Sequence, residues 1–332
     1  MSIAKRLSKA EIEGIYSAAN SAVWHSHFCA RSTARSTARE EDYVATLVTD
    51  GVPLLADRWI QILDSKGIAL RVSGVFCHGH PQVQFGPLQS PVELADLLVV
   101  HQHSEDRRYT ARAMLIQAKM STDATHHLHA SDPQLALFSR WPPFEFVTGG
   151  LEPGIRDIKE AGRGSRYALI LQEHMYPEQI TWADQCPWAV SPAKQELAAE
   201  SSLARLLGNM ILAKDGRPVQ LTAPKDDWSR TIKDLLEISG KRTFRRANIG
   251  LGHTHRLSEK YSVLTNTLFL SQSPRFARAP IPRVKPFTSD LFFNAAVEIE
   301  LDGDGNDPPD LEERRGPEDG MSALIIETLA GD

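Results

Sequence analysis

Two apolar segments, residues 95–102 and 112–119, lie symmetrically on either side of a charged stretch of the chain. They read ADLLVVHQ and RAMLIQAK, and HSEDRRYTA separates them. Short apolar runs bounded by polar residues predict β-strands, and the polar connection predicts that they pair as an antiparallel hairpin. A turn centred just after Asp106 places Asp96 opposite Gln117, because the two residues are equally far from that turn.

Lys119 lies on the same face as Gln117, because side chains on a strand alternate and the two residues are two positions apart. Asp96, Gln117 and Lys119 are therefore expected to meet at one end of an apolar hairpin. A polar cluster that ends two buried strands costs free energy unless its members pair or bind something. The pattern therefore predicts a functional site at this end of the hairpin.

The three side chains suit phosphodiester hydrolysis with a divalent cation. Hard cations such as Mg²⁺ or Mn²⁺ take oxygen ligands, and Asp96 offers a carboxylate, Gln117 an amide oxygen and the chain near Ala118 a carbonyl. A cation held there would polarise the scissile phosphate and lower the pKa of a bound water. Lys119 would hold or help deprotonate the attacking water and stabilise charge on the phosphate.

Two acidic residues are candidates to complete this metal shell. Glu41 lies at the start of the helix expected before the first strand, and we expect it to complete the shell or to orient a second ion. Glu93 is a rival for that role. It precedes Asp96 by three residues, so on a regular strand its side chain would point the other way.

The surrounding pattern predicts an α/β protein with a mixed sheet flanked by helices. Helical periodicity from residue 40 to 66 is interrupted at Pro53, and Gly67 is a plausible helix end. Asp132 is expected to cap the helix that begins at Pro133. The expected elements are helices at 9–28, 40–66 and 133–140, and strands at 68–77, 95–102, 112–119 and 166–172.

This order of elements, together with Asp96 and Gln117-Ala118-Lys119, resembles the PD-(D/E)XK nuclease superfamily. The motif of that superfamily is an acid, a variable gap, then acid-x-Lys. Gln117 stands where the second acid is usual, as in the QxK form of Mrr-like restriction endonucleases and several phage-defence nucleases. The resemblance implies a restriction-endonuclease-like fold, with Asp96, Gln117 and Glu41 binding Mg²⁺ or Mn²⁺ and Lys119 serving the water.

The resemblance also implies a function and partners. We expect a Mg²⁺-dependent endonuclease that cuts DNA, an effector of a prokaryotic anti-phage defence system. A separate sensor protein, for example an Argonaute or an ATPase, and a homodimer are the implied partners. Two alternatives stay open: a non-catalytic adaptor that binds nucleic acid or a partner on a nuclease fold, and an RNA-cleaving nuclease.

Composition fits a cytoplasmic globular protein. Hydrophobic residues make up 42% of the 332 residues, and no run is long enough for a membrane helix. Three cysteines far apart in the sequence favour a reducing compartment. The net charge of -5 is unevenly distributed, because residues 301–332 hold ten acidic and two basic side chains. Residues 228–286, by contrast, hold twelve basic and three acidic side chains.

A basic cluster within that stretch is a candidate nucleic-acid contact. Its cations are Lys241, Arg242, Arg245 and Arg246, and Phe244 lies among them. Cations interleaved with an aromatic suit a phosphate backbone with a stacked base. A solvated or salt-bridged face is an equally good interpretation. A second basic feature, with Arg at positions 31, 35 and 39, would line one helix face or belong to a linker.

The chain is expected to divide into three parts. Residues 1–180 form the nuclease-like core, 181–300 a mainly helical and basic C-terminal extension, and 301–332 an acidic tail. We expect this tail to be partly mobile and to cover the basic cluster as an autoinhibitor, so that its deletion raises DNA affinity. His78, His80 and the HHLH sequence from His126 lack the matched pairs of a zinc site and are interpreted as loop histidines.

Overall fold

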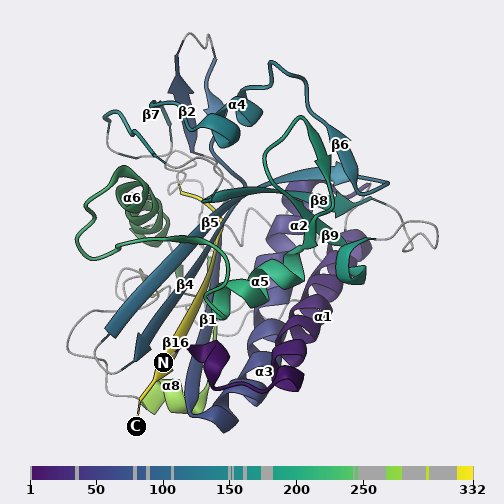
Figure 1. Ribbon diagram of the computed structural model, residues 1–332, viewed down its shortest axis with the longest axis vertical. Helices are drawn as coiled ribbons and strands as arrows, with labels where there is room; N and C mark the ends of the chain where they lie inside the picture. Colours follow the sequence, from purple (N-terminus) through teal and green to yellow (C-terminus); the bar gives the residue numbers. More distant parts are fainter. Residues whose placement is uncertain are drawn as a thin grey trace, which may run out of the picture.

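A large mixed β-sheet, with helices on both faces, forms the centre of the protein (Figure 1). The computed structural model describes residues 2–33, 37–77, 81–86, 90–105, 108–148, 151, 153–159, 163–172, 182–241, 244–245, 267–278, 297–298 and 320–331. The strand order is β11-β9-β8-β5-β4-β16-β1-β14-β13-β15, and β12 pairs with β5 beside this path. The predicted α/β class, a mixed sheet flanked by helices, is therefore confirmed.

The strands of the large sheet are β1 (Ile68–Phe76), β4 (Leu97–Glu105), β5 (Arg108–Ser121), β8 (Ser165–Leu171), β9 (Trp188–Ser191), β11 (Ser201–Ser202), β12 (Arg217–Pro218), β13 (Phe244–Arg245), β14 (Thr267–Gln272), β15 (Val297–Glu298) and β16 (Ala323–Ala330). Two small sheets are built from β2 (Gln82–Phe85), β3 (Val92–Glu93) and β7 (Phe144–Phe146), and from β6 (Thr125–His127) and β10 (Glu196–Ala198). The α-helices are α1 (Lys9–Thr33), α2 (Glu40–Thr46), α3 (Val52–Leu63), α4 (Pro133–Arg140), α5 (Leu203–Ile211), α6 (Asp227–Lys241) and α8 (Pro274–Arg278).

The predicted hairpin is present with the predicted register. β4 and β5 pair antiparallel, with Leu97 opposite Ile116 and Glu105 opposite Arg108. The same register, continued by one residue, sets Asp96 opposite Gln117. β8 pairs with β5 on its other side in the parallel direction. The apolar segments thus form the middle of the sheet, where both faces are covered.

Two apolar cores fill the space on the two faces of this sheet. Figure 1 shows α1, α2, α3 and α5 on one side, and α6, α4 and the β2–β3–β7 sheet on the other. Met114 and Ile116 of β5 belong to the first core, whereas Leu115 belongs to the second. This alternation is what the period of two along a strand requires.

The C-terminal strand β16 lies in the centre of the sheet, between β4 and β1. It runs parallel to β4 and antiparallel to β1, and Leu324, Ile325 and Ile326 are fully buried. The expectation that residues 301–332 form one acidic tail is therefore wrong for 320–331. Residues 323–330 are an apolar run of the kind that a strand buried on both faces requires. Residues 301–319 lie outside the described residues, so the expected autoinhibitory contact of the tail with the basic cluster stays a prediction.

The C-terminal half joins the same sheet. Of the stretch expected to be helical, residues 203–211 and 227–241 are helices, but β10 and β11 occupy part of 191–202. There β10 pairs with β6, and β11 pairs with β9. Tertiary pairing thus overrides the helix propensity of a sequence rich in Ala and Glu. The strands after residue 180 extend the sheet of the first 180 residues.

Several local predictions are confirmed. Asp132 caps α4, where its Oδ1 accepts a hydrogen bond from the Leu135 N–H at 3.0 Å. Pro53 lies in the first turn of α3, where its missing N–H costs nothing. A π-helical turn, Leu47–Gly51, joins α2 to α3. Gly67 adopts a left-handed conformation, with φ of 71°, at the end of the following 3-10 turn. Among the described helices, none has the length and apolarity needed to cross a membrane.

Candidate functional site

Asp96 and Gln117 are in direct contact at the point where β5 extends past the start of β4. The Asp96 Oδ2 accepts hydrogen bonds from Gln117 Nε2 and from the Ala118 N–H, both at 2.5 Å. Asp96 is 7% exposed and Gln117 is 3% exposed, so both polar groups are removed from bulk water. The hairpin register places these two groups together, as the sequence predicts.

The amide orientation of Gln117 leaves its oxygen as a buried acceptor. Its Oε1 is buried and accepts no hydrogen bond from the described residues. Turning the amide over would point that oxygen at the Asp96 carboxylate, where two acceptors would repel each other. The observed orientation is therefore the favourable one, and it leaves an oxygen that needs a donor or a cation.

Lys119 lies on the same face of β5 as Gln117, since Leu115 of the same alternating series packs into the core on that face. Lys119 is half-buried, and within the described part of the chain its ammonium makes no ion pair. It is thus the most accessible member of the predicted trio. A partly desolvated and uncompensated ammonium favours an anionic ligand.

The acidic side chain that reaches β5 from α2 is Glu40 rather than Glu41. The Glu40 Oε1 accepts a hydrogen bond from the Met120 N–H at 3.1 Å. Glu41 instead contacts Arg39, at 3.4 Å, and 40% of its side chain is exposed. The expectation for Glu41 is therefore wrong by one position, because helical periodicity does not fix which of two adjacent acids in a first turn faces the sheet.

Asp96 and Glu40 therefore lie along the same edge of β5. The N–H groups of Ala118 and Met120 point to the same edge of the strand, because backbone groups two residues apart project alike. Their separation along an extended strand is about 6.6 Å. Asp96 accepts the hydrogen bond of the Ala118 N–H, and Glu40 accepts that of the Met120 N–H. The two acids therefore reach the same edge of β5, Asp96 from the residue before β4 and Glu40 from the start of α2.

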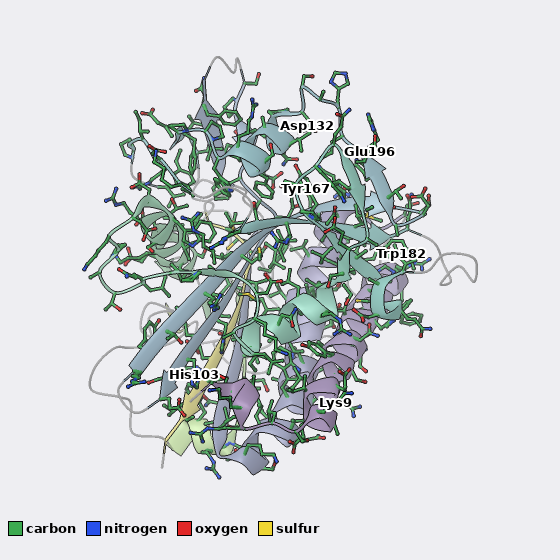
Figure 2. All side chains as sticks on the ribbon, in the orientation of Figure 1. Lys9, His103, Asp132, Tyr167, Trp182 and Glu196 are labelled. Carbon is green, nitrogen blue, oxygen red and sulfur yellow. The ribbon has the colours of Figure 1, made fainter. Side chains whose placement is uncertain are left out.

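Tyr167 of β8 also belongs to this region and was not singled out from the sequence. It is the register partner of Gln117, and its buried hydroxyl makes no hydrogen bond with the described residues. Burial first, and then the charges of Asp132 and Asp96, raise the pKa of Tyr167 above its ordinary value. Figure 2 shows Tyr167 and Asp132 in the same region, where α4 approaches the sheet. Alternation along the fourth strand, aligned with β5, could have identified it.

The remaining residues that the sequence singled out make their described contacts with residues other than Asp96, Gln117 and Lys119. Glu93 lies in the small β2–β3–β7 sheet, opposite Gln82. His127 pairs with Glu196 at 2.5 Å, an exposed contact between β6 and β10. His78 and His80 lie outside the described residues. Arg31 is in the last turn of α1, Arg39 precedes α2, and position 35 between them is outside the described residues, so the expected helix face is not established.

The predicted nucleic-acid contacts lie almost entirely outside the described part of the chain. Arg242 and Arg246 are not described. Lys241 is the last residue of α6 and Arg245 belongs to β13, but neither side chain is described. The basic cluster therefore stays a prediction.

The donor set at the β5 edge suits a hard cation that keeps some of its water. Asp96, Glu40 and the Gln117 Oε1 are oxygen donors, as Mg²⁺ and Mn²⁺ require. Among the described residues, neither Asp96 nor Glu40 belongs to a group of three histidines, cysteines or acids whose ligand atoms lie close enough together to share an ion. A cation here would therefore complete its coordination with backbone carbonyl oxygens, water or a phosphate.

Comparison with protein-family models, with curated proteins and with solved structures found no match for this chain.

Proposed function

We propose that the protein is a metal-dependent nuclease that cuts DNA, with a restriction-endonuclease-like arrangement of α2, β1, β4, β5, α4 and β8. The observation that carries this proposal is the buried Gln117 Oε1, which lacks a donor beside the Asp96 carboxylate. An apolar protein interior leaves such an acceptor unsatisfied only at a cost, which a bound cation would remove. The half-buried Lys119 on the same face supplies the complementary site for a phosphate.

Asp96, Gln117 and Glu40 would hold Mg²⁺ or Mn²⁺, which would supply charge to polarise the phosphate and to favour ionisation of water. The Lys119 ammonium donates a hydrogen bond to the attacking water or to a phosphate oxygen and stabilises charge that develops there. The Tyr167 hydroxyl, kept protonated by its raised pKa, can donate a hydrogen bond on the face of the sheet that carries Gln117.

The strands β1, β4 and β5 do not form a simple meander, because a strand from elsewhere in the chain lies between β1 and β4. β16 from the C-terminus lies between β1 and β4, although β1 keeps the direction opposite to β4. The insertion changes the neighbours of β4 on the side away from β5. It leaves the β4–β5 contact and the edge that carries Asp96 and Glu40 as they are.

The adaptor alternative has its own support. Gln117 gives the site one negative charge fewer than two acids would, which weakens its attraction for a divalent cation. On this alternative the same fold would bind DNA or a partner of a prokaryotic defence system without cutting. A separate sensor protein and a homodimer stay proposals that accompany either function.

A cleavage assay separates these proposals. Supercoiled plasmid DNA and a structured RNA are incubated with the protein in Mg²⁺ or Mn²⁺, beside Asp96→Ala and Lys119→Ala. Nicking or linearisation of the plasmid that both substitutions abolish supports the DNA nuclease. Cutting of RNA alone supports the RNA-cleaving alternative. Intact nucleic acid, with binding that persists in both variants, contradicts the nuclease and supports the adaptor.

A further inference from the structure

A second group of metal-binding side chains lies on the helical layer, away from the β5 edge. His25 and Cys29 are four residues apart on α1, and Asp50 belongs to the π-helical turn that joins α2 to α3. One ligand atom from each of these residues lies within 4.8 Å of the other two. They are the one such group of three found among the described histidines, cysteines and acids.

We propose that His25, Cys29 and Asp50 bind a transition-metal ion of the Zn²⁺ class, with water in the fourth position. The Cys29 Sγ and the His25 Nε2 are 3.8 Å apart. Two such atoms on one tetrahedral zinc would be separated by about 3.6 Å, from bond lengths of about 2.3 Å to sulfur and about 2.05 Å to nitrogen. Little movement of either side chain is therefore needed.

The chemistry of the donors selects the class of ion. A thiolate and an imidazole are ligands that zinc and its neighbours prefer, whereas Mg²⁺ and Ca²⁺ prefer oxygen. A neutral His25, an ionised Cys29 and an ionised Asp50 together carry two negative charges, which balance a divalent ion. Binding requires the Cys29 thiol to lose its proton, which passes to the solvent.

The surroundings hold one ligand in place and leave the site open. The Thr49 hydroxyl donates a hydrogen bond to the Asp50 Oδ2 at 2.5 Å, which leaves the other carboxylate oxygen to face a metal. His25 is exposed, and Cys29 and Asp50 are half-buried, so an ion can enter from water. π-Helical turns inside helices recur at functional sites, and this one brings Asp50 to α1.

Such an ion would join α1 to the connection between α2 and α3. Because α2 begins at Glu40 and runs into the π-helical turn, the ion would stabilise the helix that carries this acid to β5. This stabilisation does not depend on whether the protein cuts DNA. The proposal is therefore tested by metal binding alone.

The test uses the full chain, stripped of metal with a chelator and kept in excess Mg²⁺, and Co²⁺ is the probe. We expect a thiolate-to-cobalt charge-transfer band, proton release, and displacement of the Co²⁺ by Zn²⁺. Cys29→Ser should abolish the band, and His25→Gln and Asp50→Asn should each weaken Zn²⁺ binding at least tenfold. His127→Gln, an exposed histidine elsewhere, is the matched control and should bind as the parent does.

Two results would overturn the proposal. One is a Co²⁺ spectrum that lacks a thiolate band in the folded parent protein. The other is a Cys29→Ser variant that keeps the band and the parent affinity, which would assign the thiolate to another cysteine. His25→Gln changes an exposed side chain, so it reports on binding even if Cys29→Ser fails to fold.

Discussion

Gln117 turns its amide nitrogen toward Asp96 at 2.5 Å, and this contact is what leaves its own oxygen without a donor. A glutamate at position 117 could not make the same contact when ionised, since two carboxylates would then face each other. With glutamine at position 117, the buried pair carries only the charge of Asp96 and can be buried without a cation. A bound cation would in turn meet one negatively charged ligand fewer than with glutamate.

Gln117→Glu should lower the free energy of unfolding without added metal by about 2 kcal/mol or more, because a charge-assisted hydrogen bond is replaced by repulsion. The loss should be larger at pH 8 than at about pH 5, where the two carboxylates can share a proton. Mn²⁺ should restore the lost stability and bind more tightly than to the parent. Denaturant unfolding with and without Mn²⁺ measures both effects, and a variant that Mn²⁺ does not stabilise would contradict a cation site.

Glu40→Gln and Glu41→Gln form a matched pair that differs by one position. Glu40→Gln should weaken Mn²⁺ binding and slow plasmid cutting at least tenfold, because it removes the acid that reaches β5. Glu41→Gln should leave both unchanged, because Glu41 contacts Arg39 on the outside of the fold. Isothermal titration and a cleavage time course provide the readouts. Equal losses in the two variants would refute the assignment to Glu40.

The C-terminal strand should be essential for folding. Ile326→Ala should cost about 2–5 kcal/mol, because it leaves a cavity in a fully buried position of β16. Removing residues 320–332 should abolish cooperative unfolding, because it also removes Glu327, the buried partner of Arg71 at 2.6 Å. Ile155→Ala is the control, since Ile155 is 64% exposed and its loss should change stability by less than about 0.5 kcal/mol. A truncated chain that unfolds like the parent would disprove the central position of β16.

His27 should make the protein sensitive to mild acid. Burial, followed by the charge of Arg31, lowers the pKa of His27 from 6.5 to about 3. As the pH falls below about 6.5, His27 therefore becomes protonated in the unfolded chain, whereas in the folded protein it stays neutral down to about pH 3. The neutral His27 therefore contributes its full stability above about pH 6.5. Between about pH 6.5 and pH 3 the free energy of unfolding falls by up to about 1.4 kcal/mol per pH unit.

His27→Phe should remove this contribution. Both ring nitrogens of His27 lack hydrogen bonds with described residues, and the ring stacks on Tyr43, so a phenyl ring fits the same environment. Between about pH 6 and pH 4, the slope of unfolding free energy against pH should fall by about one proton. His129→Asn, at an exposed position, should leave the slope unchanged. An unchanged slope in His27→Phe would show that His27 is not buried as a neutral group.

The sequence was sufficient to predict the features that depend on local pattern. The hairpin register followed from the apolar runs around Asp106, and with it the contact between Asp96 and Gln117. The cap at Asp132 and the helix start at Pro53 followed from the strong preference of aspartate for the N-cap and of proline for the first turn of a helix. These predictions needed only the pairing of two strands that are adjacent in the sequence, not the order of the whole sheet.

The features that depend on distant pairing could not be predicted in this way. Nothing in the apolar run at 323–330 indicates that it lies between β4 and β1, because a strand's partners are set by the whole sheet. The choice of Glu40 over Glu41 depends on the rotation of α2 against β5. The contact of Asp50 with His25 and Cys29 depends on the π-helical turn, which shifts the side-chain phase by a fraction of a turn.

The central claim is that the edge of β5 holds a divalent cation between Asp96 and Gln117. The most direct measurement is anomalous X-ray scattering from crystals of the protein soaked in Mn²⁺, with Asp96→Ala crystals treated in parallel. We expect a peak at coordination distance, about 2.2 Å, from the Gln117 Oε1 and an Asp96 oxygen, and no such peak in the variant. Density showing Gln117 Oε1 hydrogen-bonded to a protein donor or to an ordinary water, without an anomalous peak, would contradict the claim.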